Sequence, residues 1–195
     1  MQKKWIIALG LFLVMTGIVL GESLFVKTEV KDAIFFLSLG DFLVKHGYDE
    51  HGLSAYNKAL EIDPSNKIVL NNIGYYYKDK NPLLAEDYFK KALVADNSYE
   101  TGKNNLALLY NKIGSYGKAI PYLRELVQIH PDSLQYNYDL AINLAQDYYK
   151  NTRSYDELNE ALKYFKIVYD INPNYEHALE NIKVLDEIKR TIQKD

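Results

Sequence analysis

Residues 71–77 read NNIGYYY, in which a small residue, Gly74, stands between an apolar residue and three tyrosines. Comparable stretches surround three other small residues: SLGD contains Gly40, NLAL contains Ala107 and DLAI contains Ala141. The four small residues are separated by 34, 33 and 34 positions. A fixed spacing of this length indicates a repeated structural unit rather than a single site.

A second pattern recurs later in each unit, as AYNKALEIDP (55–64), DYFKKALVADN (87–97), PYLRELVQIHP (121–131) and KYFKIVYDINP (163–173). Apolar residues in both patterns recur at three- and four-residue steps, as in Leu39 and Leu43, which is helical spacing. Three of these segments end at or near a proline, which cannot continue a helix interior and marks a corner. Each unit is therefore predicted to be a helical hairpin.

These units resemble the tetratricopeptide repeat (TPR), which carries W-x2-L-G-x2-Y, then A-x3-F and P in about 34 residues. The second unit matches with Leu70, Ile73, Gly74, Tyr77, Ala85, Phe89 and Ala92. Lys103 and Asn137 stand at the first pattern position of the third and fourth units, where a large apolar residue is usual.

The resemblance implies an all-α fold, a TPR-type α-solenoid of about four hairpins over residues 33–195. The expected repeats are 33–66, 67–99, 100–133 and 134–175. A capping helix over 176–195 should end the array with a polar outer face.

The fourth unit carries eight extra residues between its two helices, in QDYYKNTRSYDELNE. Ser154 and Glu157 have the spacing of a capping box, which predicts that the second helix begins near Tyr155 and the first runs to about Lys150. We expect a protruding hairpin. Two interpretations of it stay open, variation in length without a role and a dedicated partner contact.

The N-terminus is apolar. Trp5 to Leu20 contains no charged residue, and a helix over residues 5–26 is just long enough to cross a bilayer when tilted. Lys3 and Lys4 would keep the N-terminus in the cytoplasm and place the repeats outside it, after a short tether at 27–32. A signal peptide cleaved near Gly21 is the alternative, with a secreted or periplasmic product.

Composition excludes several classes of protein. The chain has 195 residues, no cysteine and a net charge of −3; residues 1–26 carry +1, which leaves −4 for the remainder. An acidic chain of this kind is not expected to bind nucleic acid. No H-E-x-x-H, phosphate loop or G-x-S-x-G occurs, and His46 and His51 with their acidic neighbours make a weak case for a metal. We expect no enzyme activity, cofactor or metal.

Binding is the expectation that remains. In TPR arrays the first helix of each hairpin lines a concave groove, which by resemblance places these candidate contacts there: Asn71, Tyr75, Lys78, Asn104, Leu108, Asn111, Lys112, Tyr138 and Ile142. The amides could bond a peptide backbone, the tyrosines offer apolar area and the lysines attract a carboxylate. TPR domains that clamp chaperone C-termini have an asparagine where Tyr75, Leu108 and Ile142 stand, so that ligand is not expected.

The sequence thus predicts a membrane-tethered, non-enzymatic scaffold or adaptor that binds protein or peptide partners outside the cytoplasm. A structural protein that forms homo-oligomers and an accessory subunit of an envelope enzyme complex are the alternatives.

Overall fold

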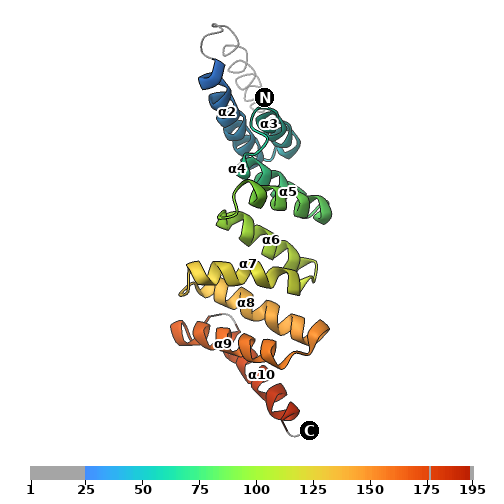
Figure 1. Cartoon of the computed structure of the whole chain (residues 1–195), viewed down its shortest axis with the longest axis vertical. Coiled ribbons are helices and arrows are strands. Elements are labelled where there is room, and N and C mark those ends of the chain that lie inside the picture. Colours follow the sequence, from blue (N-terminus) through green and yellow to red (C-terminus); the bar gives the residue numbers. More distant parts are fainter. Residues whose placement is uncertain (1–24, 176, 194–195) are drawn as a thin grey trace.

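The computed structural model describes residues 25–175 and 177–193, and the regular elements in those ranges are helices (Figure 1). In chain order they are α2 (Phe25–Lys45), α3 (Asp49–Ile62), α4 (Lys67–Tyr77), α5 (Pro82–Ala95), α6 (Glu100–Lys112), α7 (Tyr116–Ile129), α8 (Leu134–Asp147), the π-helical turn η2 (Tyr148–Thr152), α9 (Tyr155–Ile171) and α10 (Ala178–Ile192). The expected all-α, TPR-like solenoid is confirmed.

Consecutive helices pair as four hairpins, α2–α3, α4–α5, α6–α7 and α8–α9, which stack along the long axis of the molecule (Figure 1). Four residues join each hairpin to the next, at 63–66, 96–99 and 130–133. Asn66 and Ser133 end two of these turns as N-caps, since their side chains accept the backbone N–H of Val69 and Tyr136. Local capping therefore fixes where α4 and α8 begin.

The turn at 96–99 has Asn97 where the repeat pattern expects proline. Here the carboxylate of Asp96 accepts two hydrogen bonds from Ser98, one from its backbone N–H at 2.8 Å and one from its side-chain hydroxyl at 2.6 Å. Lys67, from the start of the same hairpin, also donates to Asp96. These donors, Lys67 foremost, lower the pKa of Asp96 to about 2. An ionised aspartate therefore orders the corner that a proline shapes elsewhere.

Small residues allow the two helices of a hairpin to cross closely. A Cβ placed on Gly74 of α4 would lie 2.7 Å from Cδ1 of Phe89 of α5, well inside the 3.5–4.0 Å at which carbon atoms pack. Ala107 and Ala141, at the position of Gly74 in later hairpins, and Ala119 and Ala161, at the position of Ala85, are at most 1% exposed. The ring of Phe89 fills the space left by the missing side chain and is itself 1% exposed.

Lys103 and Asn137, which break the apolar pattern, are nevertheless buried. Lys103 is 6% exposed, and its Nζ lies 2.5 Å from Oε2 of Glu125 on α7. Asn137 is fully buried and donates from Nδ2 to the carbonyl oxygens of Pro131 and Ser133, at 2.7 and 2.8 Å. An ion pair and a turn-bonding amide thus replace apolar packing at the starts of α6 and α8.

The two ends of the described array differ. At the C-terminal end α10 buries Ala178, Ile182 and Leu185 against α9 and presents Lys183 and other charged residues to solvent. At the other end Phe35 and Phe42 of α2 are 37% and 44% exposed, whereas their equivalents Val69 and Leu109 are 0% and 3% exposed. The apolar positions that internal hairpins bury are therefore open on α2.

The hydrophobic segment expected at residues 5–26 lies almost entirely outside the described residues. Residues 27–32, expected as a short tether, belong to α2, and their role as a tether stays a prediction. Over residues 25–175 and 177–193, none of the helices combines the length and apolar character needed to span a bilayer.

Replacing Gly74 by leucine should lower the free energy of unfolding by about 3 kcal/mol, because the new side chain must displace the ring of Phe89. Ala95→Leu, at an exposed position near the end of α5, is the control and should change it by less than about 0.5 kcal/mol. Urea denaturation followed by circular dichroism measures both. Equal effects of the two substitutions would show that the close crossing does not limit side-chain size.

Candidate binding groove

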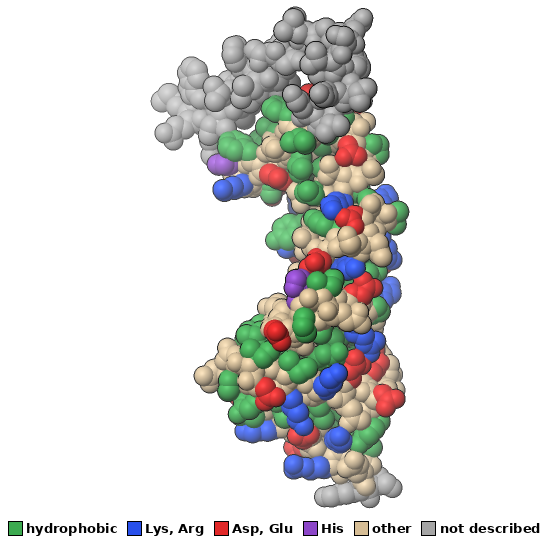
Figure 2. All heavy atoms as spheres, turned by 60° about the vertical axis from the view of Figure 1, so that its left-hand side comes forward, with side chains coloured by type: hydrophobic (Ala, Val, Ile, Leu, Met, Phe, Trp, Pro, Cys, Tyr) green, Lys and Arg blue, Asp and Glu red, His purple; other side chains and the backbone are tan. Residues whose placement is uncertain are grey.

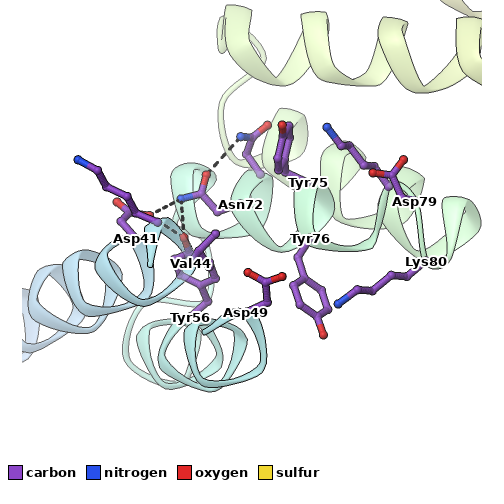
Figure 3. A pocket seen from close by; sticks show the side chains of 12 residues that line it. Asp41, Val44, Asp49, Tyr56, Asn72, Tyr75, Tyr76, Asp79 and Lys80 are labelled. Carbon is purple, nitrogen blue, oxygen red and sulfur yellow. Dashed lines mark hydrogen bonds between the residues drawn. The ribbon is translucent and has the colours of Figure 1, made fainter. Parts of the chain in front are cut away.

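The surface is hollowed on one side, between the α2–α3 end and the α8–α9 end (Figure 2). A hollow of about 580 Å³ lies where α2, α3 and α4 meet. Figure 3 shows its lining, which is Asp41, Val44, Lys45, Asp49, Tyr56, Asn71, Asn72, Tyr75, Tyr76, Lys78, Asp79 and Lys80. Three of the predicted groove residues, Asn71, Tyr75 and Lys78, line this hollow.

A chain of polar side chains joins the first three hairpins at this hollow. Oδ1 of Asp41 accepts the hydroxyl of Tyr56 at 2.7 Å and Nδ2 of Asn72 at 2.9 Å (Figure 3). Burial of the tyrosine, and secondly its bond to Asp41, raise the pKa of Tyr56. Nδ2 of the neighbouring Asn71 donates to Oδ1 of Asn72 at 3.5 Å, and Nδ2 of Asn105 of α6 donates to Oδ1 of Asn71 at 2.8 Å. Oδ1 of Asn71 is therefore bonded to the next hairpin, and the predicted contact of Asn71 with a ligand stays a prediction.

Tyr75 and Lys78 form a ridge on α4. Tyr75 is 53% exposed. Nζ of Lys78 lies 3.5 Å from the centroid of the Tyr75 ring. Beyond the ridge lies a second hollow of about 180 Å³, which shares both residues and also contains Leu108 and Lys112 of α6. Leu108 is 46% exposed. Four predicted contacts, Tyr75, Lys78, Leu108 and Lys112, are thus brought together.

Lys112 does not offer a free charge. Its ammonium group pairs with the carboxylate of Asp79, which lies at the end of the preceding first helix. The hydrogen bond from Lys112 holds the pKa of Asp79 below its usual value. Lys78 takes part in no ion pair with another described residue, so it is the better placed of the two lysines to attract a ligand carboxylate.

The remaining predicted contacts lie apart from this ridge. Asn104 borders a third hollow of about 680 Å³ beside the turn at 130–133, and its buried Oδ1 has no hydrogen-bond partner among the described residues. Tyr138 is 9% exposed, with its ring centroid 5.6 Å from that of Phe165, and Ile142 is half-buried against the same core. Asn111 is half-buried on α6. Tyr138 therefore belongs to the core rather than to an open groove.

The sequence did not single out a contact among Tyr76, Lys80 and Glu50, of which Tyr76 and Lys80 line the first hollow. The hydroxyl of Tyr76 donates to Oε1 of Glu50 at 2.5 Å, and Nζ of Lys80 lies 3.7 Å from the centroid of the Tyr76 ring. This bond lowers the pKa of Glu50 and raises that of Tyr76. The signal in the sequence was weak, because Glu50 of α3 and Tyr76 of α4 are 26 positions apart.

No group of three or more His, Asp or Glu side chains is arranged to hold a metal within residues 25–175 and 177–193. The polar clusters around the groove are hydrogen-bonded amides, phenols and ion pairs.

The family model for the tetratricopeptide repeat matches residues 34–66 and 102–133, which correspond to the first and third hairpins. Together with the stacked hairpins described above, this match confirms the expected tetratricopeptide repeats in those two hairpins.

Curated relatives include the protein O-mannosyl-transferase Tmtc3 of Drosophila melanogaster, 29% identical over 129 residues, and anaphase-promoting complex subunit 3 of Schizosaccharomyces pombe, 24% identical over 163 residues. The matches cover 66% and 83% of this chain but only 13% and 23% of those proteins. The chain therefore spans less than a quarter of the length of either relative.

Solved structures agree on the fold. YrrB, described as a TPR protein with an unusual peptide-binding site, superposes with a TM-score of 0.72 and is 26% identical, covering 85% of this chain and 81% of its own. MamA superposes with a TM-score of 0.68 at 23% identity, covering 82% and 83%, and shows the fold alone.

Replacing Asn105 by alanine should lower the free energy of unfolding by about 1–2 kcal/mol, because it leaves the buried Oδ1 of Asn71 without its donor. Asn111→Ala, on the same helix, removes an amide that no hydrogen bond joins to another described residue, and should cost less than about 0.5 kcal/mol. Urea titration of both variants tests the polar chain. Equal stabilities would mean that the asparagine pair contributes nothing to joining the hairpins.

Proposed function

We propose that this protein is a non-catalytic scaffold that binds protein partners by accepting an extended segment along the groove. The observation that carries this proposal is the ridge of Tyr75 and Lys78, which stands half-exposed between two hollows. An apolar ring flanked by two concave spaces is the arrangement that anchors a partner's side chains on either side.

The ridge also supplies charge in a fixed place. Contact with the ring of Tyr75 restricts the ammonium group of Lys78, so less side-chain entropy is lost when a ligand binds. Since Lys78 has no ion-pair partner among the described residues, a carboxylate of the ligand can pair with it. The ligand we propose is therefore a peptide segment with an apolar side chain next to an acidic one.

Asn104 offers a point of backbone recognition farther along the groove. Its Oδ1 is buried and lacks a donor within the described part of the chain. A buried acceptor without a partner costs about 1–3 kcal/mol. A peptide N–H would reach it only if the Asn104 side chain turned into the hollow that it borders, and the bond would then remove that cost.

The similarity to YrrB, described as having a peptide-binding site, supports a peptide ligand. The transferase activity of the relative Tmtc3 is not inferred for this chain, because the match covers only 13% of that protein. A non-catalytic role agrees with a fold shared with other repeat proteins.

We further propose that residues 5–26 tether the scaffold to a membrane with the repeats outside the cytoplasm. The support is the uncharged run from Trp5 to Leu20 behind Lys3 and Lys4. Because α2 begins at Phe25, an anchor in this position would hold the first hairpin close to the bilayer.

Self-association is a second candidate function, and one observation favours it. Phe35 and Phe42 of α2 expose apolar surface at positions that internal hairpins bury. A second copy could cover this face.

Tyr75→Ala should weaken peptide binding about 10- to 50-fold, because it removes both the apolar anchor and the surface that positions Lys78. The probe is the tightest peptide selected by phage display against the full chain, labelled and measured by fluorescence polarisation. Leu83→Ala, on α5 and 78% exposed, is the control and should change affinity less than about twofold. A peptide that binds both variants equally well would contradict the proposed groove.

Alkaline washing of membranes from cells that express the full chain should leave the protein in the membrane fraction. Leu13→Arg, which places a charge in the middle of the apolar run, should release it. N-terminal sequencing of the retained protein should begin at Met1. A sequence beginning near Glu22 would instead identify a cleaved signal, and intact chain in the soluble fraction would refute both forms of the proposal.

A further inference from the structure

The tip of the fourth hairpin has an unusual backbone. The sequence predicted that the first helix of this hairpin runs to about Lys150. In the structure α8 ends at Asp147 and is followed by the π-helical turn η2. Arg153, the next residue, lies in the left-handed region with φ of 52°. It is the one non-glycine residue with positive φ among the described residues. Glycine or asparagine would adopt this conformation more easily, so Arg153 adopts it at an energetic cost. Such a cost suggests that its side chain has a use.

Local hydrogen bonds hold the tip in this shape. The Ser154 hydroxyl accepts the N–H of Glu157 at the start of α9, as the predicted capping box requires. The second half of the box differs, because the carboxylate of Glu157 accepts the hydroxyl of Thr152, and Thr152 in turn accepts the N–H of Ser154. The tip is therefore an ordered element rather than a loose insertion.

Two cations are positioned on tyrosine rings at this tip. The guanidinium carbon of Arg153 lies 4.8 Å from the ring centroid of Tyr149, which is 59% exposed. Nζ of Lys150 lies 4.8 Å from the ring centroid of Tyr116 on α7 and 3.1 Å from its hydroxyl oxygen. Both cationic side chains are exposed.

The carboxylates of the tip do not neutralise these cations. Asp147 is 6% exposed and accepts Nδ2 of Asn151 at 2.6 Å, and Glu157 is bonded to Thr152. Within the described part of the chain neither Lys150 nor Arg153 belongs to an ion pair, with Asp156 or with any other acid.

We propose that Tyr116, Tyr149, Lys150 and Arg153, which we call the cationic tip, form a second interaction surface that binds an acidic segment of a partner protein. Carboxylates of the segment pair with the two cations, and an apolar side chain beside them covers the exposed ring of Tyr149. The surface lies at the far end of α8, away from the groove ridge on α4. It would allow the scaffold to hold two partners at once.

The test uses the full chain and a fluorescein-labelled peptide of three Glu-Glu-Phe-Gly units, followed by fluorescence polarisation. The control peptide has glutamine in place of glutamate. The glutamate peptide should bind at least tenfold more tightly than the control, with an affinity that falls as salt rises. Equal affinities for the two peptides would overturn the proposal.

Arg153→Gly combined with Lys150→Gln should reduce affinity for the glutamate peptide at least tenfold. Glycine suits the left-handed backbone, so the melting temperature should not fall, and a loss of binding cannot be attributed to unfolding. Lys166→Gln, an exposed lysine on α9, is the matched charge control and should have little effect.

Tyr75→Ala separates this proposal from the groove. Because the probe has glutamate beside phenylalanine, it also fits the ligand proposed for the groove, so the tip variants are repeated in the Tyr75→Ala background and should again lower its affinity at least tenfold. If Tyr75→Ala lowers the affinity and the tip variants do not, the acidic peptide occupies the groove and the cationic tip is refuted. Light scattering provides a further outcome. If the native chain is a dimer and the double variant is a monomer, the tip binds a second copy of the chain instead of an acidic partner.

Discussion

The close crossing of the two helices in each hairpin is the constraint on which the other features depend. At Gly74 the absence of a side chain lets the ring of Phe89 lie against the backbone of α4. Because a helix has 3.6 residues per turn, fixing Gly74 toward α5 turns the next residue, Tyr75, about 100° away from that contact. The same contact that builds the hairpin therefore determines which residues the groove displays.

Most of the fold could be predicted because its determinants are local and repeated. Helical spacing, small residues near the crossings and the capping residues Ser154 and Glu157 all lie within short stretches of sequence. What could not be predicted depends on residues from other helices. The burial of Lys103 needs Glu125 of α7, and the ordered turn after Ala95 needs Lys67 from the start of α4. One sequence offers no means of pairing such residues in advance.

The groove, too, could be predicted where it depends on local sequence and not where it depends on contacts between hairpins. Position within the repeat placed Tyr75, Lys78, Leu108 and Lys112 around two adjoining hollows, but it could not reveal what each polar group already binds. Asn71 is taken by Asn105, and Lys112 by Asp79, across neighbouring hairpins. These pairs depend on how the hairpins stack. Candidate contacts drawn from repeat position alone therefore overstate how many side chains are free for a ligand.

The difference between the two ends of the array gives the solenoid a direction. A further hairpin placed before α2 would bury Phe35 and Phe42 as internal hairpins bury Val69 and Leu109. A hairpin placed after α10 would have to cover Lys183 and its charged neighbours, which costs free energy unless they are paired. Charge therefore opposes lengthening of this array after α10, whereas α2 presents exposed apolar surface at Phe35 and Phe42.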